Sequence, residues 1–577
     1  MNQIPADTVD LHGTLALIEE HFAAVAKAVA DGEFALWVGS GISREKAPDL
    51  AVLAADLIEH LRAELNLNDA GDPYRATLER IMRELLGMDQ AAVQALPLDV
   101  AFNAWPDAQA IAEGLRNRYS EMLNLRVPGK ERDYLLWAAV DVRAKYGSLN
   151  DPDVEHLSVA LLVLEGAVTE IASGNWDGLI EVAVDRLSAT GREGILRKVV
   201  NPDDIREPVA AATLLKFHGC AVACVADPDA FRPFLVGAER DIIDWPNVDD
   251  PLRREVVRMA TNRRALVVGL SLQDGNLKDV FSRAKAVHAW HWPVAPAAQP
   301  HVFCEDQLGG PQRTVLEVIY GDDFDAHEQE ILAAALLRAR PRTALPALAL
   351  HVVADKLCAL AERCTAGLQP EERADLLLGI EHLRDLSAAG APADRKQLAT
   401  FLTSAIAAWS RSVTLFRKGE VPPVGSQAYA GISPLRRTAM MGDGNLAQSG
   451  LDEAATALAL IGRLVKSGQA SVSTTDGGAA DGALVVKATY DNATAKKVTF
   501  VGGSDAVLQL AADGALDDKD TIIVHSNDVY VRTALGSRRS PSGSASPGAR
   551  HVSVRQLVGQ SANLGMLEQR FLEEAAL

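Results

Sequence analysis

The stretch Phe34–Ser43, FALWVGSGIS, joins a short apolar run to a glycine-rich turn. The run Phe34–Val38 is apolar throughout, which is typical of a strand buried on both faces in a parallel sheet. The turn Gly39–Ser43 follows at once, and the next segment, Leu50–Glu64, is predicted to be a helix. A strand, a glycine turn and a helix in this order open a nucleotide-binding α/β unit. A Gly-Ser-Gly turn can also be a turn and nothing more.

Working outward, further strand-like runs alternate with helical segments. They are Ala167–Ile171, Thr213–Phe217, Ala265–Val268 and His301–Cys304. This alternation predicts the α/β class, with a doubly wound, parallel, Rossmann-like sheet. Residues 66–160 are rich in Leu and Ala without good strand candidates, so we expect a large helical insert there.

The chain is long enough for several domains, because it has 577 residues. We expect one α/β domain over residues 1–340 and a helical domain over 341–470. A small C-terminal α/β module should follow over 471–577. Residues 468–482 have the composition of a flexible linker. The segment Gly536–Arg550 is rich in Ser, Gly and Pro, which predicts a disordered loop.

Composition excludes several classes of function. The net charge of −20 argues against direct nucleic-acid binding, which needs clustered Lys and Arg. Five cysteines in so long a chain do not make a disulfide scaffold. The first residues are polar and acidic, so we expect no signal peptide. The apolar runs Val159–Leu164 and Ile331–Leu337 are too short to cross a membrane, and we expect a soluble cytoplasmic protein.

Polar residues follow the predicted strands where ligands of open α/β sheets bind. Asn175 and Asp177 come after the strand Ala167–Ile171, in the sequence SGNWDGLIE. Asn can orient a water or a ribose hydroxyl, and Asp can accept a hydrogen bond from one. The alternative is an Asx turn with a helix N-cap.

Two more motifs end strands in the same way. His218 ends the apolar run in LLKFHG, and a histidine there can act as a general base. A lone histidine can equally be structural. The sequence VVGLSLQD places Gly269, Ser271 and Asp274 after another strand, where they could close over the adenosine half of a nucleotide. The plain alternative is a strand-to-loop turn.

The order GSGIS, SGNWDGLIE, KFHG, VVGLSLQD resembles the motif series of the sirtuin (silent information regulator two) family over residues 20–310. The resemblance implies that the first motif cradles the phosphates of NAD and that a loop closes over the adenine ribose. It also implies that an Asn and an Asp hold the nicotinamide ribose, and that a histidine is catalytic. The matching residues here are Gly39, Ser40, Gly41 and Ile42, then Asn175 and Asp177, His218, and Gly269 and Ser271. Ser43 and Asp274, which lie in the same two turns, are further candidates for NAD binding.

The chain departs from the family's deacylases. Cys220 and Cys224 lie close in sequence, Cys304 stands alone, and Cys358 and Cys364 lie in the helical region, so the spacing of a zinc ribbon is absent. We therefore expect no metal. What remains resembles the sirtuin-like, NAD-cleaving effectors of bacterial anti-phage defence, which share a helical insert and extra C-terminal domains.

The resemblance implies an NAD+ glycohydrolase, with NAD as substrate, that depletes NAD in defence. Asp177 would hold the ribose hydroxyls, Asn175 would position the water or the ribose, and His218 would accept a proton. The alternatives are an NAD-dependent protein deacylase and a non-catalytic NAD or ADP-ribose sensor or assembly subunit. Because an ungated NADase would kill its host, we expect a homo-oligomer gated by a partner. The resemblance implies a partner such as a HerA-like ATPase or a short Argonaute, and the few strands of the C-terminal module favour the ATPase over the Argonaute.

Overall fold

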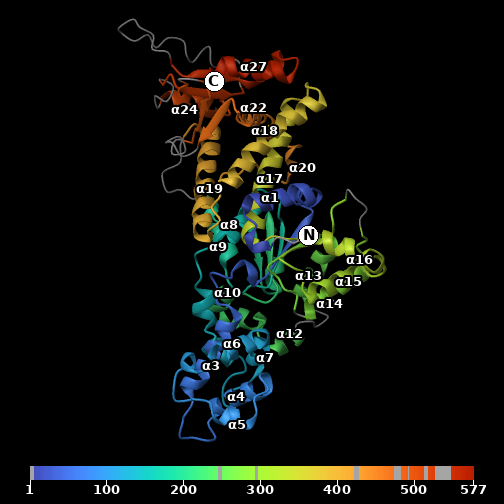
Figure 1. Cartoon of the computed structure of the whole chain (residues 1–577), viewed down its shortest axis with the longest axis vertical. Coiled ribbons are helices and arrows are strands. Elements are labelled where there is room, and N and C mark those ends of the chain that lie inside the picture. The colour runs from blue at the N-terminus through green and yellow to red at the C-terminus, as the bar shows by residue number, and fades with distance from the viewer. Residues whose placement is uncertain are drawn as a thin grey trace.

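The structure is a computed structural model that describes residues 5–244, 250–273, 275–292, 297–420, 428–473, 482–490, 493–512, 518–526 and 548–577. Three parts follow one another along the long axis of the molecule (Figure 1). A helical insert forms one end, a parallel sheet with its helices lies in the middle, and a second sheet forms the other end.

The central sheet has seven strands in the order β3-β4-β2-β1-β5-β6-β7, and all their pairings are parallel. The strands are β1 (Phe34–Val38), β2 (Glu170–Ser173), β3 (Leu196–Val199), β4 (Ala212–Lys216), β5 (Arg264–Val268), β6 (His301–Cys304) and β7 (Leu336–Leu337). The chain places β2, β3 and β4 on one side of β1, with β4 between β2 and β3, and then places β5, β6 and β7 in order on the other side. The predicted parallel α/β sheet is confirmed, and this order is compatible with a Rossmann-like fold.

Three strands of the central sheet differ from the prediction by more than one residue. β3 is unexpected because Arg197 and Lys198 interrupt its apolar pattern, and β7 because it has only two residues. β2 begins three residues later than expected. Gly166, with φ of +67°, makes the turn after the preceding helix, and Ala167 and Val168 follow it before the strand begins.

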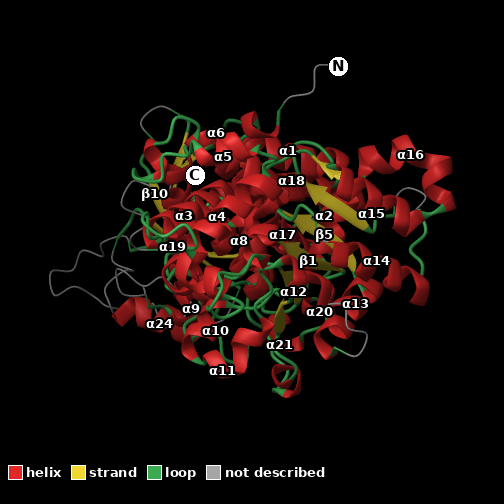
Figure 2. Cartoon of the chain, turned by 90° about the horizontal axis from the view of Figure 1, so that it is seen from below, coloured by secondary structure: helices red, strands yellow, loops and turns green. Residues whose placement is uncertain are grey.

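Helices cover both faces of this sheet, and the alternation of β1 shows how. Phe34, Leu36 and Val38 point to one face, where they join a single apolar core with helices α1, α2, α8, α9 and α17. Ala35 and Trp37 point to the other face, against helices α13, α14 and α15. The bounds are α1 (Leu11–His21), α2 (Ala23–Ala30), α8 (Val154–Leu164), α9 (Leu179–Leu187), α13 (Pro251–Asn262), α14 (Gly275–Val287), α15 (Gly310–Tyr320), α16 (Asp322–Ala334) and α17 (Pro341–Cys364). Figure 2, viewed along the long axis, shows helices surrounding the strands of the molecule.

The helical insert has a core of its own. Its main helices are α3 (Leu50–Glu64), α4 (Pro73–Arg80), α5 (Gln90–Gln94), α6 (Ala108–Leu115) and α7 (Tyr119–Asn124). We expected the insert over residues 66–160. The packing instead places α3 in the core of the insert and α8 in the core of the sheet, because the apolar stripe of each helix faces that side.

The C-terminal part is a mixed sheet on a helical platform. The helices are α18 (Pro370–Ala389), α19 (Arg395–Lys418), α20 (Arg437–Met440), α21 (Gly444–Ala447) and α22 (Leu451–Lys466). The second sheet has the order β12-β11-β10-β9-β8, with β10, β11 and β12 parallel and β8 and β9 antiparallel to their neighbours. Its elements are β8 (Ala470–Ser473), β9 (Leu484–Ala488), β10 (Lys496–Val501), α24 (Ser504–Ala512), β11 (Thr521–His525), β12 (Arg550–Ser553), α26 (Val554–Gln560) and α27 (Leu564–Ala575).

Two predicted flexible segments overlap this sheet. β8 occupies part of the stretch expected to be a linker, of which residues 474–481 lie outside the described residues. Residues 536–547 of the expected disordered loop also lie outside them, whereas Arg550 already begins β12. The alternating residues Ser471 and Val472 explain β8, because a half-buried edge strand needs only one apolar face.

Helix α17 belongs to two cores at once. Leu345, Leu348 and Val352 pack in the core of the central sheet, whereas Leu357 and Leu360 pack with α18, α22 and the second sheet. Among the described helices it is the one long and apolar enough to cross a membrane, and 67% of its apolar window is buried inside the protein. This burial is what the core helix of a folded domain shows.

A fully buried ion pair ties α17 to the end of α8. Lys356 Nζ donates to Glu165 Oε2 at 2.6 Å, to Glu165 O at 2.6 Å and to Ser433 O at 2.7 Å. Glu165 Oε1 accepts hydrogen bonds from Tyr429 Oη and Ile432 N. All three protons of the ammonium group therefore have acceptors, as a buried charge requires.

The crossing of α18 and α22 depends on two glycines. A Cβ at Gly379 would lie 2.0 Å from Ala459 O, and a Cβ at Gly462 would lie 2.0 Å from Gly379 O. We expect Gly462→Ala to lower the free energy of unfolding by about 1–3 kcal/mol or more, because the helices must move apart. Urea unfolding measures this, with Gly559→Ala as the control, since a Cβ at Gly559 meets no atom within 4 Å. Equal stability of the two variants would contradict the close crossing.

His301 should make stability depend on pH. Burial lowers the pKa of this histidine to about 3, and its Nε2 has no hydrogen-bond partner among the described residues. The unfolded chain takes up this proton near pH 6.5, whereas the folded protein resists it. The unfolded state therefore binds more protons between pH 6.5 and 3, and stability is lost as the pH falls through this window. Urea midpoints across pH should fall less steeply for His301→Gln than for the wild type, and parallel curves would contradict the prediction.

Candidate functional site

Four loops meet at the carboxyl edge of the central sheet. Strands β2, β1 and β5 are neighbours, and β4 lies beside β2. Because all four strands are parallel, the turns that follow them lie on the same edge. These turns contain the motifs GSGIS, SGNWD, FHG and GLS, so the structure brings the predicted motifs together.

The first glycine turn packs against the fourth motif. Gly41 N donates to Gly269 O at 2.9 Å, and Gly269 has φ of +65°. A Cβ at Gly39 would lie 2.6 Å from Gly269 O, and a Cβ at Gly41 would lie 2.5 Å from Gly269 Cα. Here the glycines allow two backbone turns to approach each other, which is a structural requirement separate from any role in phosphate binding. Ser40, between them, is exposed.

The hydroxyl of Ser43 joins three polar side chains from two segments, helix α8 and the turn between β2 and α9. Its Oγ lies 3.0 Å from His156 Nε2, 3.0 Å from Asp177 Oδ2 and 3.3 Å from Asn175 Nδ2. We call these four residues the Ser43 network. Every member is buried, with exposed fractions between 0% and 7%. Sequence reasoning placed Ser43 with the phosphate-binding turn, whereas here its side chain holds Asn175 and Asp177.

The direction of each hydrogen bond follows from the backbone around His156. Asp153 N donates to His156 Nδ1 at 3.2 Å, so Nδ1 is an acceptor and the proton lies on Nε2. Nε2–H then donates to Ser43 Oγ, and the hydroxyl proton is left to point at Asp177 Oδ2. Burial lowers the pKa of His156, which keeps the imidazole neutral.

Asn175 has one polar atom to spare. Because Ser43 Oγ already donates to Asp177, it can only accept from Asn175, and the Nδ2 group must face it. The other atom, Oδ1, is buried and has no hydrogen-bond partner among the described residues. A buried carbonyl without a donor costs free energy, and one in a candidate site marks a place where a ligand hydroxyl or a water can donate.

Both carboxylate oxygens and the backbone oxygen of Asp177 accept hydrogen bonds from the protein. Its Oδ1 accepts from Leu179 N at 3.1 Å, at the start of α9, and its Oδ2 accepts from Ser43. Lys216 Nζ donates to its backbone oxygen. The predicted role of Asp177 was to hold ribose hydroxyls; in this structure each carboxylate oxygen already holds a protein donor.

Lys216 supports the site from within the sheet. Its ammonium group is fully buried, 3.3 Å from Glu181 Oε1 and 3.4 Å from Cys220 Sγ. Burial alone would lower the pKa of Lys216, but Glu181, Cys220 and Asp177 together hold it above the usual range. The lysine is therefore charged and pins the turn that carries Asp177.

His218 lies just after the neighbouring strand β4, against the turn that follows β2. It is half-buried, its ring packs edge-on against Phe217 with centroids 4.6 Å apart, and its backbone oxygen accepts from Val236 N. A Cβ at Gly174 would lie 3.5 Å from His218 Nδ1, so the imidazole borders the turn that leads to Asn175. A half-buried histidine at this position can exchange a proton with a bound ligand or water.

The helical insert packs against the turn that carries Asn175 and Asp177. Trp176, between Asn175 and Asp177, turns into the core of the insert and packs edge-on against Tyr146, with centroids 5.3 Å apart. Its backbone oxygen accepts from Ala221 N. Any shift of the insert therefore acts on the turn that carries Asn175 and Asp177.

The remaining predicted residues are less informative. Ile42 is buried in the core of the sheet, and Ser271 is exposed. Asp274 lies outside the described residues. Within the described ranges no group of three or more His, Cys, Asp or Glu side chains is placed to hold a metal ion, and the five cysteines are free.

Two residues of the site, His156 and Lys216, were not predicted from the sequence. His156 lies in a segment assigned to the insert; the signal was DPDVEH, in which Asp153 caps a helix and His156 is three residues later. Lys216 lies inside an apolar strand, and a lysine in such a place signals a buried partner.

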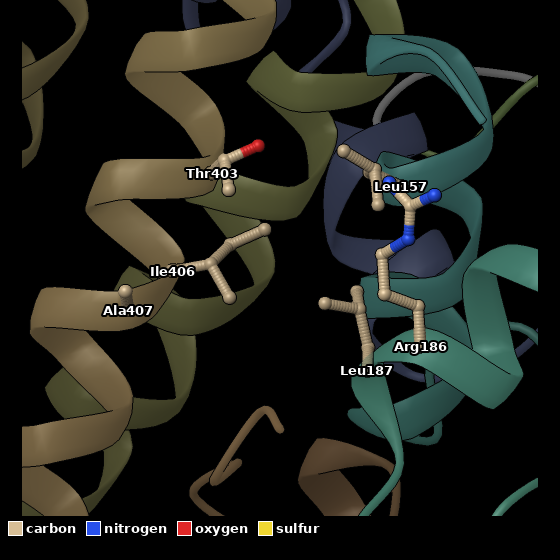
Figure 3. Close-up of a pocket in the computed structure, with 6 residues that line it drawn as sticks. All are labelled: Leu157, Arg186, Leu187, Thr403, Ile406 and Ala407. Carbon is tan, nitrogen blue, oxygen red and sulfur yellow. The ribbon is translucent and has the colours of Figure 1, made fainter. Parts of the chain in front are cut away.

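A small cavity lies elsewhere. It has a volume of about 30 Å³ and is lined by residues of α8, α9 and α19. Leu157, Leu187 and Ile406 line it with three neighbours, Arg186, Thr403 and Ala407 (Figure 3). This volume suits one or two water molecules and excludes a dinucleotide.

No family model matches this chain, and no curated protein matches it. The function therefore has to be inferred from the residues and their geometry.

Proposed function

We propose that the protein is an NAD+ glycohydrolase that cleaves the bond between nicotinamide and ribose. The observation that carries this proposal is the spare acceptor of Asn175. A buried amide oxygen, held in place by the Ser43 network, lies on a turn that borders His218 at the carboxyl edge of a parallel sheet. The motif order that resembles the sirtuin family points to NAD as the ligand.

The chemistry requires little from the protein. The C–N bond breaks, its electron pair leaves with nicotinamide, and the departing ring is neutral because it started as a cation. A water oxygen then bonds to the ribose carbon. In this proposal Asn175 Oδ1 accepts from the ribose hydroxyl or the water, and His218 takes the proton that the water loses. Asp177 accepts the proton of the Ser43 hydroxyl, which leaves the oxygen of Ser43 to accept from Asn175 and so fixes the orientation of the Asn175 amide.

Regulation belongs to the same proposal. The insert packs against the turn that carries Asn175 through Trp176, so a movement of the insert would change the access of NAD to the site, as the movement of a lid does. A neighbouring copy of the chain or a partner protein, such as the HerA-like ATPase that the resemblance implies, would favour the open arrangement. The consequence in a cell would be NAD depletion during phage infection.

The test is nicotinamide release by the purified full chain, alone and with a candidate ATPase, followed by chromatography. We expect release from NAD+ that falls by about 10²–10⁴-fold in His218→Ala. The exposed His21 gives the matched control, His21→Ala, which should match the wild type.

Each alternative has its own outcome. Nicotinamide release only when an acetylated peptide is present would identify a deacylase. Binding of NAD or ADP-ribose without release, alone and with the partner, would identify a sensor. Wild-type rates in His218→Ala would show that this histidine is not the base.

A further inference from the structure

We infer that His156 is a positioning residue for the proposed reaction, which acts through Ser43 to fix the orientation of the Asn175 amide. The inference rests on the proposed function for its kinetic consequence. Its structural part, the proton on Nε2 and the bond to Ser43, stands on the geometry alone.

The first step is the fixed tautomer of His156. Its Nδ1 faces the backbone N–H of Asp153, at 3.2 Å, and an N–H cannot face another N–H. The imidazole is entirely buried on α8, and among the described residues Nε2–H has one acceptor, the oxygen of Ser43 at 3.0 Å. His156 is thus a permanent donor to that hydroxyl.

The second step concerns what a hydroxyl can do. Ser43 has one proton and two lone pairs, and the donation from His156 occupies one lone pair. Its proton goes to Asp177, and the second lone pair accepts from Asn175. Without the donation from His156, the Ser43 hydroxyl could turn toward Asn175 as a donor, and the amide could flip to present Nδ2 where Oδ1 now lies.

The third step is what holds His156. Its turn begins at Asp153, whose Oδ2 accepts from Arg395 Nε at 3.0 Å. The same arginine donates to both oxygens of Glu155, at 2.8 and 2.9 Å. Burial raises the pKa of Glu155 to about 7, in spite of this arginine. Arg395 is the first residue of α19, so a helix of the C-terminal part secures the turn that orients the histidine.

The kinetic test uses five proteins: the wild type, His156→Leu, His156→Gln, Ser43→Ala and the double variant. We expect kcat for NAD+ to fall by about 10²-fold in His156→Leu, as for other misplacements of catalytic groups. In His156→Gln the amide N–H can still reach Ser43, and most of the activity should return. If His156 acts through Ser43, adding His156→Leu to Ser43→Ala should lower kcat no further.

A structural role would give a different pattern. The two substitutions would then multiply their effects, glutamine would be no better than leucine, and the inference would be overturned. The control is His21→Leu, which changes an exposed histidine at the end of α1 and should leave kcat unchanged.

A measurement without turnover separates the inference from the proposed function. Nitrogen NMR of histidine-labelled protein at pH 7 should show His156 as a neutral ring with its proton on Nε2, and that signal should shift in Ser43→Ala. The loss of this signal in His156→Gln assigns it to His156. A ring protonated on Nδ1, or on both nitrogens, would overturn the inference even if NAD+ is cleaved. The expected signal in a chain that cleaves no NAD+ would instead overturn the proposed function.

Discussion

Asn175→Ala is expected to lower nicotinamide release by about 10²–10⁴-fold while leaving the fold as stable as before. The loss of activity follows from the loss of the spare acceptor Oδ1. Stability should change little, because two effects oppose each other. The variant loses the hydrogen bond from Nδ2 to Ser43, but it also removes a buried oxygen that has no donor among the described residues.

Rates of NAD+ loss and thermal melting of the same preparations check this prediction. Asn445→Ala is the matched control, because Asn445 is exposed in the C-terminal part, far along the chain from the Ser43 network. A strongly destabilised Asn175→Ala would mean that the asparagine is structural. A stable variant with full activity would exclude it from the chemistry.

The second large effect concerns stability. Lys356→Met should lower the free energy of unfolding by about 3–5 kcal/mol, because it leaves the carboxylate of Glu165 buried without its countercharge. Removing the charge on both sides, in Lys356→Met with Glu165→Gln, should cost less than the sum of the two single changes, since no uncompensated charge remains.

Urea unfolding measures these values, with Arg206→Met as the control. Arg206 pairs with Asp203 on the surface, where both side chains are 85% exposed, and its loss should change stability by less than about 0.5 kcal/mol. Additive costs in the double variant, or a Lys356→Met protein as stable as the control, would contradict the prediction.

The central sheet could be predicted because a parallel strand buried on both faces consists of consecutive apolar residues. β1 was predicted with its observed bounds, and β5 and β6 with bounds within one residue, since burial on both faces keeps these strands apolar after their first residues, Arg264 in β5 and His301 in β6. β3 lies at the edge of the sheet, where Arg197 and Lys198 are tolerated, and its pattern is therefore broken.

The candidate site could be predicted only where it follows a strand. Asn175, Asp177 and His218 sit directly after apolar runs, and the parallel sheet brings those ends together. His156 reaches Ser43 from 113 residues away in sequence, and Lys216 reaches Glu181 from 35. Such pairings depend on how helices pack against the sheet, which a local pattern does not encode.

Helix α17 has a consequence for how this chain can be divided. A boundary at residue 340 looks natural in sequence, because the strands of the central sheet end there. The first half of the helix, however, packs in the apolar core on one face of that sheet, and its second half packs in the core of the second sheet. A fragment that ends at residue 340 would expose an apolar face, and one that begins there would carry half a helix with nothing to cover it. The two halves of this protein are therefore expected to be expressed in folded form only together.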